Sequence, residues 1–164
     1  MKKSFKVTGW ILLAVLIVIQ FFRHEENIGP AFAGHRLQDA YKVPPEVDVI
    51  LTASCDDCHS NNTRSMWYMN IQPVGWWIDH HVDEGKAELN FDEFGTYSLA
   101  RQYHKFEEIG ELVNEGEMPL TSYTIMHDYA KLSDQDKKLL VGWSESMRAW
   151  MKETYPEDSL VRKK

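Results

Sequence analysis

Cys55-Asp56-Asp57-Cys58-His59 is the stretch that constrains the fold of this chain most strongly. Its C-x-x-C-H spacing is the attachment signature of c-type haem. In that chemistry two thiols add across the porphyrin vinyl groups, and the histidine beside the second thiol reaches the iron from the proximal side. The stretch therefore predicts one covalent haem c with its iron, attached through Cys55 and Cys58 and ligated by His59.

Other uses of these two cysteines, the only ones in 164 residues, are open at this point. A Cys55–Cys58 disulfide closes a very short loop and adds little stability. A zinc site needs a second Cys/His pair at a comparable spacing, which the sequence lacks. A redox dithiol needs electropositive surroundings to lower a thiol pKa, whereas Asp56 and Asp57 stand between the thiols. We therefore favour haem attachment.

A second iron ligand is expected from Glu117-Met118-Pro119-Leu120. A methionine in a loop after a helix suits a distal thioether ligand, and the proline behind it stiffens the loop because its φ angle is fixed. A methionine that simply fills the core is the alternative. Met118 is thus the predicted distal ligand, and His59 and Met118 are the predicted metal ligands. The rival distal ligands are Met126, His127, His80 and His81.

Apolar residues recur at steps of three and four over several segments, which is typical of helices that bury one face. The predicted helices run from Pro45 to the attachment motif, over 75–89, over 99–113, and onward from Ser133. Gly116 is the predicted end of the third helix, and Ser133 with Asp136 forms a predicted capping box. Arg64, in the loop after the motif, suits a haem propionate, and a solvated surface position suits it equally well.

The N-terminus places Lys2, Lys3 and Lys6 before an apolar run over 7–22. As a helix this run is about 24 Å long, near the roughly 30 Å of a bilayer's hydrocarbon core. The nearest small-x-small cleavage site, 31–33, lies well beyond the run, so we expect an uncleaved anchor. By the positive-inside rule the lysines stay in the cytoplasm, which predicts a single-pass protein of the bacterial cytoplasmic (inner) membrane with its haem domain facing the periplasm.

The predicted fold is accordingly all-α, with an N-terminal transmembrane helix followed by a cytochrome-c-like bundle of about four helices around one haem. The predicted parts are an anchor (1–23), a linker (24–43), a haem-binding domain (44–154) and a flexible tail (155–164).

The charges are distributed unevenly along the chain. Residues 30–164 hold 14 Lys or Arg and 23 Asp or Glu. A surface of this sign disfavours nucleic acid and anionic lipid as partners, and it permits a basic redox protein.

Beyond the attachment motif, the chain carries further short stretches in a fixed order. With the motif they are CDDCHSN (55–61), WY (67–68), IQPV (71–74), EGK (84–86), LNF (89–91), GEMP (116–119), YTIMH (123–127) and AKLS (130–133). This series resembles the small bacterial haem-binding domain family of membrane-anchored, cytochrome-c-like proteins. The chain departs from the family pattern at Met66 and Leu120, where prolines are frequent.

The resemblance implies a mainly helical fold, covalent haem at Cys55 and Cys58, proximal ligation by His59 and distal ligation by Met118. We expect an electron carrier rather than an enzyme, with redox proteins and the membrane as partners and no small-molecule substrate. The alternative is a haem-based sensor or enzyme whose distal site is open or His-ligated. A third interpretation is a non-redox interaction domain in which the two cysteines form a disulfide.

Overall fold

The computed structural model of the chain describes residues 2–23 and 26–161. Every regular element within those residues is helical, so the all-α part of the predicted fold is confirmed. The α-helices are α1 (Lys2–Ile19), α2 (Leu37–Ala40), α3 (Pro45–Ser54), α4 (Asp56–His59), α5 (Val74–Glu88), α6 (Leu99–Glu115), α7 (Thr121–Thr124) and α8 (Asp134–Thr154). The short 3-10 helices are η1 (Trp67–Asn70), η2 (Phe91–Thr96), η3 (Asp128–Ala130) and η4 (Glu157–Ser159).

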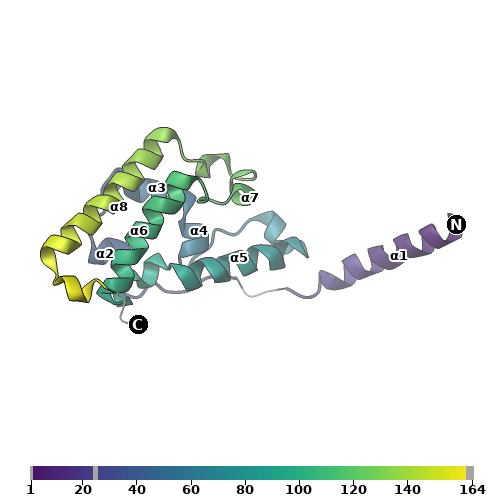
Figure 1. Cartoon of the computed structure of the whole chain (residues 1–164). Helices are drawn as coiled ribbons and strands as arrows, with labels where there is room; N and C mark the ends of the chain where they lie inside the picture. The colour runs from purple at the N-terminus through teal and green to yellow at the C-terminus, as the bar shows by residue number, and fades with distance from the viewer. Residues whose placement is uncertain (1, 24–25, 162–164) are drawn as a thin grey trace.

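Helices α6 and α8 lie side by side and form the frame of the domain (Figure 1). Phe106 of α6 packs edge-to-face on Trp143 of α8, with ring centroids 5.4 Å apart. Gly110 allows this close approach, since a Cβ there would lie 2.8 Å from the Ser144 hydroxyl. Large aromatic side chains contribute much of the burial free energy, so this pair anchors the core.

The ends of these helices follow the signals in the sequence. At the start of α8, the Asp136 amide donates to the Ser133 hydroxyl (3.2 Å) and the Ser133 amide donates to the Asp136 carboxylate (3.0 Å). This is the predicted capping box. Helix α6 ends at Gly116, which has a φ of +76°. This left-handed conformation is costly for any residue with a side chain. The chain reverses there and turns back towards the interior.

The segments that flank the domain also contribute to it. In the predicted linker, Leu37 and Tyr41 are buried in the core, and Tyr41 packs edge-to-face on Phe106 at 5.0 Å. In the predicted tail, Leu160 is buried and Tyr155 packs against the core. Residues 24–25 of the linker and 162–164 of the tail lie outside the described residues.

The N-terminal helix corrects one part of the predicted fold. Helix α1 projects away from the other helices in Figure 1 and ends at Ile19, with Gln20 and its neighbours in a turn. Its apolar part, 7–19, is therefore about 20 Å long, and three lysines precede it within the same helix. Among residues 2–23 and 26–161, no helix combines the length and the apolar composition needed to cross a membrane. The predicted transmembrane helix, and the single-pass anchoring in the inner membrane that depended on it, are therefore wrong.

Candidate functional site

The attachment motif lies where one helix stops and a single new turn begins. Helix α3 ends at Cys55, whose amide donates to Leu51 O (2.9 Å). Both Cys58 and His59 then donate their amides to Cys55 O, at 3.1 and 3.0 Å. The turn α4 thereby brings both thiols and the imidazole together within five residues. In the part of the chain that the structure describes, Cys55 and Cys58 are free thiols and no disulfide joins them.

All four predicted site residues line one cavity of about 540 Å³. Cys55, Cys58 and His59 come from α4 and its start, and Met118 comes from the loop after α6. The walls are largely apolar and come from α3, η2, α6 and α8. They include Leu51, Phe91, Ile109, Leu112, Val113 and Leu140. Cofactor pockets have volumes of about 300–1,000 Å³ and apolar walls with few polar groups, so the cavity suits a flat apolar group such as haem.

His59 is held by backbone oxygens at the end of α5. Its Nδ1 lies 3.0 Å from Gly85 O and 2.9 Å from Leu89 O. Because carbonyl oxygens only accept, Nδ1 must carry the proton, and Nε2 is left with the lone pair that a metal requires. Burial is the main cause that lowers the pKa of His59 below its usual value, so the ring stays neutral at pH 7.

A glycine makes the contact between α5 and the attachment turn possible. A Cβ at Gly85 would lie 2.6 Å from Cys58 O, closer than side-chain carbons approach an oxygen. Only glycine therefore lets α5 bring its Gly85 carbonyl to His59 at this distance. The resemblance included this EGK stretch, but the backbone hydrogen bond itself has no sequence signature.

The two thiols are poorly suited to redox dithiol chemistry. Burial, reinforced by Asp56 and Cys58, raises the pKa of Cys55 to about 12. Burial, reinforced by Asp57, raises the pKa of Cys58 to about 11. A reactive dithiol needs a lowered thiol pKa, so the surroundings act against that alternative, as the acidic residues of the motif predict.

Met118 enters the cavity because the chain reverses after α6. Beyond Gly116, the amides of Glu117 and Met118 both donate to Leu112 O, at 2.9 and 3.1 Å. These two bonds wrap the segment around the end of α6, and Met118 packs, half-buried, against the core. Its thioether therefore lines the same cavity as the imidazole of His59, which lies 59 positions earlier in the chain.

The rival distal ligands lie in different surroundings. His80 is exposed and pairs with Glu84 at 3.3 Å. Met126 and His127 line a second, smaller cavity and not the one that contains His59. His81 lines both cavities, and its Nδ1 lies 2.8 Å from Trp77 O. Met118 and His81 are thus the candidates that share a cavity with His59.

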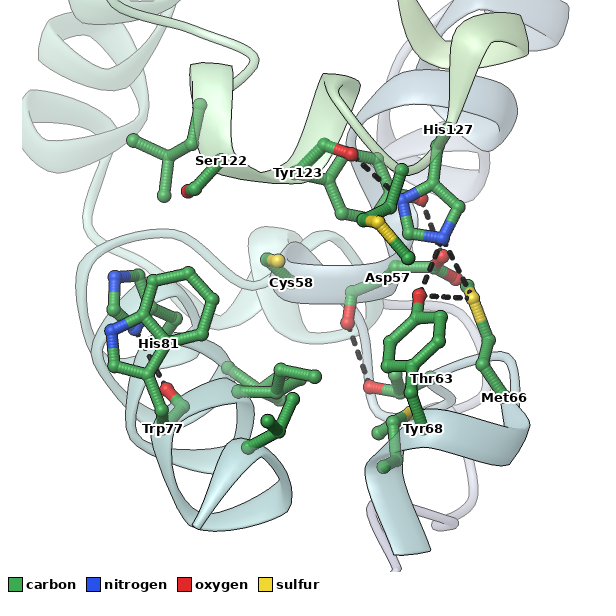
Figure 2. Close-up of a pocket in the computed structure, with 16 residues that line it drawn as sticks. Asp57, Cys58, Thr63, Met66, Tyr68, Trp77, His81, Ser122, Tyr123 and His127 are labelled. Carbon is green, nitrogen blue, oxygen red and sulfur yellow. Dashed lines mark hydrogen bonds between the residues drawn. The ribbon is translucent and has the colours of Figure 1, made fainter. Parts of the chain in front are cut away.

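The smaller cavity has a volume of about 320 Å³ and shares Cys58, His81, Leu120 and Tyr123 with the larger one. Figure 2 shows Trp77 and His81 on one side of it, Tyr68 and Met66 on the other, and Cys58 between them. His127 is buried at its edge, with Nε2 2.6 Å from the Tyr68 hydroxyl. The two cavities therefore meet at Cys58.

Polar contacts that the sequence did not reveal fix the segments around the motif. Asn61, two residues after His59, donates its amide to the Asp92 carboxylate (2.8 Å) and accepts from the Asn90 side chain (2.8 Å). Two stretches of the resemblance, CDDCHSN and LNF, therefore meet through buried side chains. Arg64, a candidate propionate partner, instead donates to Asp57 at 2.9 Å.

Comparison with known proteins gives one match. A family model described as a haem-binding domain matches residues 14–146, which is most of the chain. No curated protein and no solved structure matches this chain.

Proposed function

Because the chain belongs to the haem-binding domain family, we propose that it carries one covalent haem c and transfers single electrons between redox proteins. Cys55 and Cys58 form the thioether bonds, His59 is the proximal ligand and Met118 is the distal ligand. A haem iron in this site supplies one-electron chemistry, and the residues around it determine its ligation and potential.

The observation that carries the proposal is the meeting of these four side chains in one apolar cavity of about 540 Å³. The His59 proton is held on Nδ1 by two carbonyl oxygens, so Nε2 is the atom available to iron. Apolar walls favour the reduced, less charged iron, and a thioether ligand acts in the same direction. If His59 and Met118 both bound the iron, they would leave no coordination position for a substrate, so this pair of ligands favours electron transfer over catalysis.

The partners that fit are redox proteins. Residues 30–164 carry an excess of nine acidic over basic side chains, with 23 against 14. A surface of this sign attracts a basic protein and disfavours nucleic acid.

The test is the visible spectrum of the full chain, produced together with a haem-attachment system and extracted with acidic organic solvent to remove loose haem. We expect a retained c-type spectrum, with a methionine–iron charge-transfer band in the oxidised form. A colourless extracted protein contradicts haem attachment. Retained haem without that band contradicts Met118 as the ligand.

A second candidate function rests on His81, which also lines the large cavity. If His81 ligates the iron, or if the distal position is open, the chain is a haem-based sensor or enzyme. Carbon monoxide distinguishes an open distal position from ligation by Met118, because it binds rapidly to an open site and slowly where Met118 must first dissociate. A His81→Ala variant that changes the spectrum favours the second function.

A further inference from the structure

Asp57, between the two attachment cysteines, is a buried carboxylate with partners on two other segments. Its side chain is 6% exposed. One carboxylate oxygen accepts from the Arg64 backbone amide (3.1 Å) and Nε (2.9 Å), and the other accepts from the Tyr123 hydroxyl (2.6 Å). A buried carboxylate is stable only when such donors replace water, so these contacts offset its desolvation.

Tyr123 belongs to the segment that carries Met118. It lies in α7, five positions after Met118, and its side chain lines both cavities. Its ring stacks on His127 with centroids 4.2 Å apart. Figure 2 shows Tyr123 above Cys58 and Asp57. The Tyr123–Asp57 bond therefore joins the ligand segment directly to the attachment turn.

Arg64 forms hydrogen bonds with both Asp57 and Tyr123. Its Nη2 donates to the Tyr123 hydroxyl (3.3 Å) and to Ala53 O at the end of α3 (3.0 Å). Burial and the neighbouring Asp57 both raise the pKa of Tyr123, so its hydroxyl keeps the proton that it donates. The motif, the loop after it and the ligand segment are thus joined through one carboxylate.

We infer that Asp57 and Tyr123 form a latch that positions Met118 over the iron. The inference rests on the proposed function, since it assumes a haem between His59 and Met118. Asp57 and Tyr123 are positioning residues: they hold the segment on which the thioether ligand lies. Without their bond the segment opens more often, and an external ligand reaches the distal position more easily.

The test is Tyr123→Phe in the haem-loaded full chain, with imidazole as the competing distal ligand. Phenylalanine keeps the ring stack on His127 and removes only the hydroxyl. A hydrogen bond to a buried charge corresponds to roughly a tenfold or larger change in an equilibrium, so imidazole should bind about tenfold more tightly because the open population rises by that factor. On heating, the methionine–iron band of Tyr123→Phe should also weaken at a lower temperature than that of the wild type. The matched control is Tyr103→Phe, whose half-buried hydroxyl meets Arg148 on the α6–α8 side.

Two outcomes overturn the inference. One is an imidazole affinity for Tyr123→Phe equal to those of the wild type and of Tyr103→Phe. The other comes from Asp57→Ala, which removes the acceptor: if Tyr123→Phe has the same effect with and without this second change, the effect does not pass through the Asp57–Tyr123 bond.

A haem-free measurement separates this inference from the proposed function. In the haem-free chain, amide hydrogen exchange over 117–127 should be about tenfold faster in Tyr123→Phe than in the wild type. Unchanged exchange refutes the latch even if the chain binds haem as proposed. If exchange is faster but the spectrum shows that Met118 is not the ligand, the Asp57–Tyr123 bond holds the segment and it is the ligand assignment of the proposed function that fails.

Discussion

Replacing Gly85 by alanine tests the contact that holds His59 in place. The new Cβ would lie 2.6 Å from Cys58 O and 3.3 Å from Cys58 Cβ. An ordinary contact needs about 3.4 Å, so α5 and α4 must separate by roughly 0.8 Å. That movement lengthens the 3.0 Å bond from His59 Nδ1 to Gly85 O beyond hydrogen-bond range.

The size of the effect follows from comparison with Gly142, a second glycine inside a helix. No atom lies within 4 Å of a Cβ placed at Gly142. By helix propensity alone, either substitution stabilises the protein by about 0.8–1.0 kcal/mol. Overpacking at Gly85 costs about 1–3 kcal/mol, so Gly85→Ala should be less stable than Gly142→Ala by that amount.

The assay is denaturant unfolding of both variants, followed by potentiometry of the haem-loaded forms. His59 becomes a weaker electron donor when it loses a carbonyl partner, so the potential of Gly85→Ala should rise while that of Gly142→Ala stays unchanged. Equal unfolding free energies for the two variants would show that the attachment turn tolerates the extra carbon. Gly85 would then not be the residue that holds His59 in place.

Met118→Ala should abolish the methionine–iron band and speed carbon monoxide binding. Met126→Ala should change neither, because Met126 is 58% exposed. Visible spectra check both variants. In the haem-free chain the unfolding free energy should fall as pH rises from about 9 towards 12. The pKa values of Cys55 (about 12) and Cys58 (about 11) are raised in the folded state, so the unfolded state loses its thiol protons first. Denaturant titrations over that range should show a shallower decline for Cys55→Ala. Phe106→Ala should lower the unfolding free energy by about 3–5 kcal/mol, measured the same way, since Phe106 is fully buried between α6 and α8.

Local features of this protein could be predicted from contiguous residues. The C-x-x-C-H spacing, the Ser133–Asp136 capping box and the end of α6 at Gly116 each depend on residues within a few positions of one another. Their conformations follow from short-range hydrogen bonds and backbone preferences, which the sequence states directly.

The apolar N-terminus shows where such patterns mislead. Hydropathy predicts one continuous span over 7–22, but α1 ends at Ile19 and includes the lysines that precede the run. Hydropathy counts apolar residues and does not state where a helix begins and ends. The length of the helix therefore had to come from the structure.

The sequence by itself determined which residues can do the chemistry: two thiols and an imidazole in one turn, and a methionine followed by proline. The tertiary structure decided which of them meet. Met118 shares a cavity with His59 and Met126 does not, because the chain reverses at Gly116 and returns past Leu112 O. The carbonyls that hold His59 belong to the backbone, which has no sequence signature. Contacts between distant segments depend on the packing of whole helices, and a local pattern carries no record of that packing.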